Sequence, residues 1–335
     1  MPGDPRLPRR RTRHAGRLRV WLAVGVLTGA LTLGQATSLE AADSAPLRTA
    51  AAAAARQAHF SSAEQAVEAL LAAVRGDRLD TLARILGPHG AKLIRSGDPV
   101  ADREAREHFV AAYEQAHRLE QHGPSRAVLY VGREDWPLPI PLVSADGAWR
   151  FDTQAGEQEI LDRRIGRNEL HVIQTCRAYV DAQREYARLQ AAAGAQAEYA
   201  QHFLSHPGQH DGLYWPVNAG EAESPLGPLV AQARAEGYAT EPRAGKPRPY
   251  YGYYYRILRR QGTHAPGGAR DYLIGGRMIG GFALLAYPAR YGDSGVMTFI
   301  VDQDGIVFQK NLGPRTAAIA RAVEQYDPDS SWTTP

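Results

Sequence analysis

The sequence predicts an α+β protein. Amino-terminal helices and a curved, cone-like antiparallel sheet come first, followed by a long helix and a carboxy-terminal four-stranded antiparallel meander with a covering helix. Two observations predict this class. Apolar residues recur at three- and four-residue spacing in 60–119 and 168–190, which is typical of amphipathic helices. Residues 127–153 and 253–311 instead alternate in polarity or run apolar between Asp-Gly and Gly-Gly turns, as antiparallel strands do.

The first 42 residues have the three parts of a secretory signal peptide. Residues 1–19 contain seven arginines and one acid, and an apolar run extends from Val20 to Gly34 before several small residues. This run is shorter than the ~20 residues that a transmembrane helix needs. We expect cleavage between Ala36 and Ala42, export to the periplasm or the extracellular space, and no stable transmembrane segment after processing. The alternative is that the leader is retained as an anchor.

The predicted leader carries most of the positive charge. The whole chain has a formal charge of +3, and residues 1–42 hold seven arginines against Asp4 and Glu40, or +5, so the remaining residues carry −2. A surface with both charge signs and little net charge does not indicate nucleic-acid binding. Cys176 is the one cysteine, which excludes an intramolecular disulfide, and the apolar spacing around it predicts a small buried helix residue.

Residues 43–59 are rich in alanine and are predicted to be a linker, and residues 60–165 form the first folded segment. Ser61 or Ser62 can cap a helix that ends at Gly76-Asp77, and further helices are expected at 79–86 and 102–119. Period-two patterns then predict strands at 127–131, 136–143 and 148–153, the last two joined by a hairpin at Asp146-Gly147. Alternating prolines make 136–143 an edge strand or a bulged one.

This order of helices and curved sheet over 60–165 resembles the layout of nuclear-transport-factor-2-like proteins. The resemblance implies a cone that often holds a pocket, in which one carboxylate or histidine can act as a base. Asp135, Asp152 and His171 are the residues that could serve. Ordinary surface or turn charges are the alternative, because nothing in the sequence pairs them.

Residues 166–249 are predicted to hold the long helix, at 168–190, and a connector rich in Gly and Pro with a short helix at 226–235. His202, His206 and His210 fall four apart, which on an unbroken helix would place them on one face, where they could bind zinc. Pro207-Gly208 interrupts such a helix, and we see no carboxylate or cysteine at ligand spacing. We therefore expect surface histidines, no metal site and no cofactor.

Residues 250–332 hold the densest strand signals of the chain. We expect strands at 253–260, 280–287, 296–301 and 306–311, joined as a meander, and a covering helix at 314–326. The paired glycines between them have strands on both sides. A phosphate-binding loop would need a strand before the glycines and a helix after them, so nucleotide binding is not expected.

The runs GYYYRILRRQGTHAPGGARDYLIGG and MIGGFALLAYPARYGDSGVMTFIVDQDGIVFQKNLG, with YDPDSSW near the end, resemble the uncharacterised bacterial family called domain of unknown function 2950. The segments LHVIQTCRAYVDAQREYA and DGLYWP fit it too, so the resemblance covers most of 60–332. It implies a secreted or periplasmic protein and transfers no catalytic residues. The carboxy-terminal sheet also faintly resembles that of pilin-like proteins, but no pilin leader is present.

Three functions remain open. The one we favour is a non-enzymatic module of the cell envelope whose aromatic-rich carboxy-terminal sheet binds a protein or a polymer. The second is a small-ligand-binding protein or enzyme, which uses either the amino-terminal cone or a polar cluster of Arg256, His264, Asp271 and Asp293. The third is a self-assembling structural subunit. The residues that we select for partner binding are Tyr253, Tyr255, Arg256, His264, Asp271, Tyr287, Tyr291 and Trp332.

Overall fold

A computed structural model describes residues 57–218, 220–239 and 247–335, all of which belong to one compact unit by their backbone contacts. The predicted signal peptide and residues 43–56 of the predicted linker lie outside these ranges. The last linker residues are fixed to the fold, because Gln57 Nε2 donates to the carbonyls of Ile85 (3.1 Å) and Phe151 (2.6 Å).

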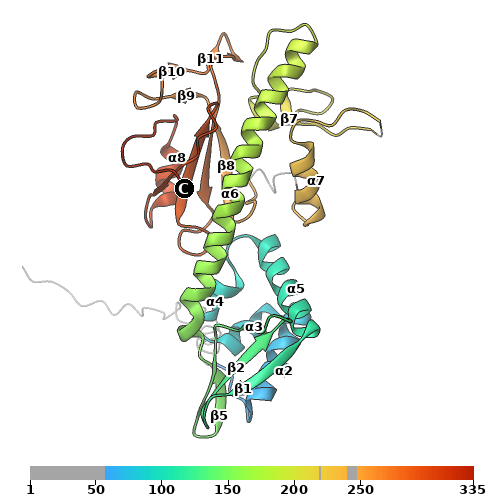
Figure 1. The fold of residues 1–335 in the computed structure, drawn as a ribbon, viewed down its shortest axis with the longest axis vertical. Helices are drawn as coiled ribbons and strands as arrows, with labels where there is room; N and C mark the ends of the chain where they lie inside the picture. Colours follow the sequence, from blue (N-terminus) through green and yellow to red (C-terminus); the bar gives the residue numbers. More distant parts are fainter. Residues whose placement is uncertain (1–56, 219, 240–246) are drawn as a thin grey trace, which may run out of the picture. The chain divides into compact units, whose positions relative to one another are not determined.

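The first part of the described chain consists of four helices and an antiparallel sheet (Figure 1). The helices are α2 (Ala63–Arg75), α3 (Leu79–Leu86), α4 (Gly90–Ile94) and α5 (Pro99–Gln115). The strands are β1 (His117–Gln121), β2 (Arg126–Val131), β3 (Trp136–Pro137), β4 (Leu142–Ala145) and β5 (Ala148–Phe151), in the order β1-β2-β4-β5 with β3 on β2. Ser62 caps α2 by accepting from Gln65 N, as predicted.

Two elements of this part differ from the sequence prediction. The helix expected to reach residue 119 ends at Gln115, and His117–Gln121 pair with β2 as an edge strand instead. Four of these five residues are polar and three are exposed, so the sequence showed no apolar alternation here. The strand expected over 136–143 is broken into β3 and the start of β4, because Pro139 and Pro141 have no N–H to donate to a ladder.

The central helix α6 (Thr153–Ala192) has 40 residues and begins 15 residues before the predicted start at Asn168. Its first turns lack a wide apolar face and hold (i, i+4) polar pairs, such as Glu159 with Arg163. Gly156 allows this end of the helix to approach the chain before β4, since a Cβ there would lie 2.4 Å from the carbonyl oxygen of Pro139. The helix therefore extends through a stretch without amphipathic periodicity.

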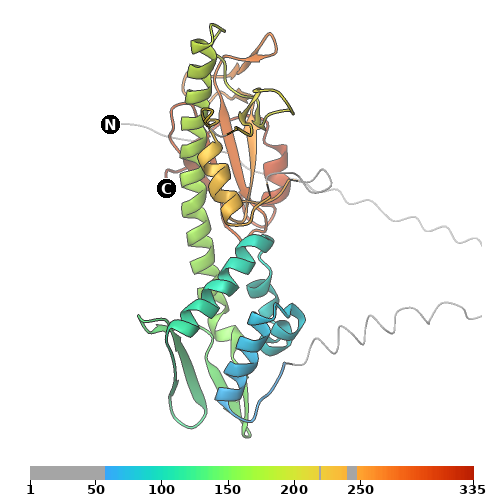
Figure 2. The same ribbon diagram turned by 90° about the vertical axis from the view of Figure 1, so that its right-hand side faces the viewer.

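The carboxy-terminal sheet is the predicted meander. Strands β8 (Tyr253–Leu258), β13 (Ala283–Pro288), β14 (Met297–Asp302) and β15 (Phe308–Asn311) pair in that order, all antiparallel. Helices α6 and α8 (Thr316–Ala322) lie on opposite faces of it (Figure 2). Alternation along β8 agrees with this, because the Tyr253 hydroxyl lies 3.3 Å from Glu169 of α6 whereas Arg256 donates to the carbonyl of Ala320 in α8.

Short elements fill the connections around this sheet. A parallel pair, β6 (His202–Leu204) and β7 (Gly212–Tyr214), is followed by α7 (Gly227–Ala235). Two small hairpins separate β8 from β13: β9 (Arg260–Gln261) with β10 (Arg270–Asp271), and β11 (Leu273–Ile274) with β12 (Arg277–Met278).

The buried side chains form two hydrophobic clusters. One joins α2–α4 with the first sheet around Leu129, Leu142 and Phe151. The other joins α6, α7 and α8 with the carboxy-terminal sheet around Tyr179, Phe282 and Phe299. Within the described ranges, none of the helices combines the length and the apolarity that a membrane span requires.

Candidate ligand-binding cavity

A cavity of about 580 Å³ lies beside the carboxy-terminal sheet. Thr175 and Tyr179 of α6, His202–Leu204 of β6, and Leu229, Val230 and Ala233 of α7 form part of its wall; Tyr255 and Ile257 of β8 and Leu284 of β13 form another. The segment 247–250 and Tyr238 also line it, together with Gln201, Leu226, Ala239, Arg256 and Arg259. Apolar atoms predominate, and a volume of this size is typical of small-molecule sites.

The tyrosine hydroxyl groups of this wall can donate hydrogen bonds at neutral pH. Burial raises the pKa of Tyr255 well above its usual value, and burial likewise raises the pKa values of Tyr238 and Tyr250. Their hydroxyl groups are therefore protonated at neutral pH. Tyr255 is half-buried, and its hydroxyl donates a long hydrogen bond (3.5 Å) to the carbonyl of Tyr250. Arg259, which is exposed, adds a positive charge at the rim.

Of the residues that the sequence selected for partner binding, only Tyr255 and Arg256 contribute to this cavity. Tyr253 is completely buried, and its hydroxyl donates to the carbonyl of Met297 (3.0 Å), so its side chain offers no surface to a partner. The Arg256 guanidinium donates to the carbonyls of Ala320 (2.7 Å) and Arg321 (3.0 Å), which fixes α8 to the sheet.

The other five selected residues lie apart from the cavity lining. His264 pairs with Asp327 (3.1 Å) and Asp271 is exposed in β10. The remaining three are half-buried: Tyr287 packs near Tyr254, Tyr291 donates to Asn311 (3.1 Å), and Trp332 lies under the ammonium of Lys310. Their proposed role in binding stays a prediction.

The three acid–base candidates of the cone each have a different neighbour. Asp135 pairs with Arg118 (3.2 Å), and Asp152 directly precedes α6. The His171 ring stacks on Tyr251 at 3.8 Å, and burial lowers its pKa. These positions do not assemble one acid–base site.

A buried carboxylate that sequence reasoning missed lies close to the cavity. Asp98, 1% exposed, caps α5 by accepting from Val100 N and Ala101 N, and it also accepts from Gly252 N (2.8 Å) and Tyr238 Oη (3.1 Å). Burial raises its pKa despite these bonds. The sequence Asp98-Pro99 is a recognisable helix start, but the bond to Gly252 spans 154 residues.

The hydrogen bond from Gly252 N to Asp98 stabilises a strained turn. Tyr250 and Tyr253 exchange backbone hydrogen bonds around Tyr251 and Gly252, both of which have positive φ (47° and 74°), as in a type I′ hairpin. A bulky residue rarely adopts this conformation. Asp98 therefore helps to fix the start of β8, the strand that bears Tyr255.

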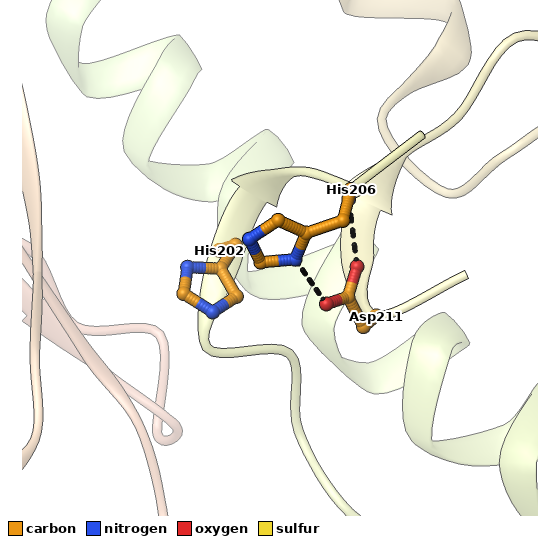
Figure 3. A group of neighbouring side chains, drawn as sticks. All are labelled: His202, His206 and Asp211. Atoms are coloured by element: carbon orange, nitrogen blue, oxygen red, sulfur yellow. Dashed lines mark hydrogen bonds and ion pairs between the residues drawn. The ribbon is translucent and has the colours of Figure 1, made fainter. Parts of the chain in front are cut away.

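A histidine–carboxylate cluster adjoins the cavity (Figure 3). The side chains of His202, His206 and Asp211 offer donor atoms that all lie within 4.8 Å of one another. His206 Nδ1 lies 2.5 Å from Asp211 Oδ2, and His206 N donates to Asp211 Oδ1 at 2.9 Å. Burial disfavours the charged form of Asp211, but the bonds from His206 outweigh it and hold the pKa of Asp211 below its usual range.

The cluster differs from the histidine pattern expected from sequence. No helix forms here, as Pro207 predicted, and His210 instead stacks on Trp215 at 4.3 Å. The sequence showed no carboxylate at ligand spacing, but in the structure Asp211 contacts His206 because the loop closes. Cys176 is buried in α6 as predicted, and burial raises its pKa to about 12.

Comparison with known proteins identifies a family. The model of the family described as "Protein of unknown function (DUF2950)" matches residues 57–334, almost the whole described chain. No curated protein and no solved structure matches the sequence significantly, so the resemblance of 60–165 to nuclear-transport-factor-2-like proteins stays a prediction. The match confirms the resemblance noted in the sequence, and the chain is a member of the DUF2950 family of proteins of unknown function.

Proposed function

We propose that this protein is an exported, non-enzymatic binding module of the cell envelope, whose cavity beside β8 takes the apolar part of an amphiphilic ligand. The observation that carries the proposal is the cavity of about 580 Å³ with its mainly apolar lining. Apolar pockets with a few polar groups are the usual sites of small-molecule binding.

The polar groups of the wall suit a ligand with a hydrogen-bond acceptor or an anionic group. The phenols of Tyr255 and Tyr250 remain protonated and can donate. Arg259 and Arg248 supply positive charge among the lining residues. A ligand with an apolar body and an anionic end would satisfy both parts of this surface, and a lipid or an acylated envelope component has that chemistry.

The alternative site in the amino-terminal cone has less support. Its side chains Leu129, Leu142 and Phe151 are at most 1% exposed and pack against the helices as a core. The cavity beside β8 instead lies in the carboxy-terminal part of the chain, and its wall includes Tyr255, a residue that the sequence selected for binding.

The binding proposal can be tested with 1-anilinonaphthalene-8-sulfonate, which has aromatic rings and one anionic sulfonate. We expect its fluorescence to rise on the native protein and a fatty acid to displace it. Ala233→Phe places a ring in the cavity wall and should weaken dye binding at least about tenfold, or 1.4 kcal/mol. Ala231→Phe, on the exposed side of the same helix, is the matched control.

Dye binding that is equal in wild type and both variants would contradict the proposal. Urea unfolding of each variant shows whether the protein remains folded. If Ala233→Phe does not fold, Leu229→Trp provides a second cavity-filling variant. Tyr255→Phe removes one hydrogen-bond donor but does not fill the cavity, so it should weaken dye binding less than Ala233→Phe does.

Export rests on the leader sequence and is a separate part of the proposal. Residues 1–42 combine an arginine-rich start, an apolar run and small residues. The mass and amino-terminal sequence of the protein recovered from cells should show a new terminus between Ala36 and Ala42. An intact terminus on membrane-bound protein would favour a retained anchor instead.

A further inference from the structure

We infer that His202, His206 and Asp211 bind a zinc ion at the edge of the cavity. Two imidazoles and one carboxylate are a donor set that zinc accepts in proteins, with water or a ligand group in the fourth position. Magnesium and calcium prefer oxygen donors alone, so the two histidines disfavour them. This site is independent of the ligand-binding proposal, although His202 belongs to both surfaces.

The backbone that carries these donors is held in a defined shape. His206 to Gln209 form a type II turn, with Pro207 and then Gly208 (φ 75°) at its centre and a hydrogen bond from Gln209 N to His206 O (2.9 Å). Tyr186 of α6 donates to the His210 carbonyl at 2.9 Å. The loop between β6 and β7 is therefore bonded both within itself and to the long helix.

The two strands on either side bring His202 and Asp211 together. His202 pairs with Gly212 in the parallel ladder, and Asp211 immediately precedes that glycine. A Cβ on Gly212 would lie only 2.6 Å from the backbone of Leu204, so the absence of a side chain permits this close approach. The donors thus converge because of strand pairing and not because of their spacing in sequence.

The distances require only a small adjustment around an ion. Zinc lies about 2.1 Å from nitrogen and oxygen ligands, so tetrahedral ligand atoms are about 3.4 Å apart. The donor atoms lie within 4.8 Å of one another before any ion is bound. Because His202 and His206 are exposed, their rings can rotate by this amount. The ion would take the place of the direct contact between His206 Nδ1 and Asp211 Oδ2.

A simple ion pair between His206 and Asp211 is the competing account of the same geometry. It gives no role to His202 and predicts no metal affinity. The position of His202, whose ring lies 5.2 Å from that of His206, is what distinguishes the two accounts.

The test is zinc titration of the processed protein, produced without a histidine tag and treated with a chelator, by calorimetry and by thermal unfolding. We expect one zinc ion per chain and a higher melting temperature with zinc. His202→Ala and Asp211→Asn should each weaken binding at least about tenfold, the range seen when a zinc site loses a supporting group.

His210→Ala is the matched control, because His210 lies in the same loop but stacks on Trp215 outside the cluster. It should bind zinc as the wild type does. The inference is overturned if the wild-type protein does not bind zinc, or if His202→Ala binds it as tightly as the control. Unfolding without zinc shows that the variants are folded, and Co²⁺ absorption in the tetrahedral range gives an independent signal.

Discussion

The buried carboxylate of Asp302 should make the protein less stable as pH rises from about 4 to 6. Asp302 ends β14, is 1% exposed and accepts a hydrogen bond from Asp304 N (3.1 Å). Burial raises its pKa to about 6, against an ordinary value of 3.8. Asp302→Asn keeps the shape and the accepting oxygen but removes the charge, which isolates the effect of ionisation.

The size of the effect follows from the shift in pKa. One unit corresponds to 1.36 kcal/mol, so a shift from 3.8 to about 6 corresponds to roughly 3 kcal/mol as an upper bound. Below pH 3.8 the carboxyl is protonated in both states and costs nothing. Between these pKa values the folded state holds its proton while the unfolded state releases it, so stability falls as pH rises. Above pH 6 the full cost is present.

Urea unfolding of wild type and Asp302→Asn at pH 4, 5, 6 and 7.5, followed by both fluorescence and circular dichroism, measures this difference. We expect similar free energies of unfolding at pH 4 and a variant that is about 1–3 kcal/mol more stable at pH 7.5. Asp304→Asn keeps Asp302 but removes a nearby charge that also raises its pKa, so this variant should reduce the pH dependence without abolishing it. A difference that is constant across the pH range, or a variant less stable at pH 7.5, would refute the reasoning.

Two further outcomes are expected at other buried groups. Asp98→Ala should lower the free energy of unfolding by about 2–4 kcal/mol in urea, since it removes a helix cap and leaves the buried Gly252 N–H without its acceptor, whereas Asp98→Asn should lower it less. Cys176 should not react with a thiol reagent at pH 8 in the native protein and should react once guanidinium unfolds it; rapid native labelling would show that the thiol is accessible.

The carboxy-terminal meander could be predicted because each of its strands carries its own signal. Strand β13 is apolar at nearly every position and β14 almost so, as strands covered on both faces are, and Asp304-Gly305 marks the turn after β14. The observed bounds differ from the predicted ones by at most three residues. Local pattern and tertiary burial agree here, so sequence reasoning succeeds.

The start of α6 could not be predicted in the same way. Its first 15 residues are stabilised by polar (i, i+4) pairs and by contacts with other elements, such as the bonds from Arg164 to the carbonyls of Lys92 (2.9 Å) and Leu93 (2.5 Å). Those contacts join residues about 70 positions apart. Such long-range contacts leave no periodic pattern in the local sequence, so the apolar spacing predicts only the later part of the helix.

The histidine cluster shows why a correct local inference can still miss a site. Pro207-Gly208 rightly excluded a helix, and with it the face on which three histidines would have met. The same two residues build the type II turn that directs the chain back, so that Asp211 reaches His206 and strand pairing brings His202 beside them. A spacing of four residues places side chains on one face only where the backbone is helical. In this loop the turn determines which side chains meet. The zinc titration therefore tests a site that the backbone geometry forms. The same geometry keeps His210 out of the cluster, and His210→Ala is for that reason the control.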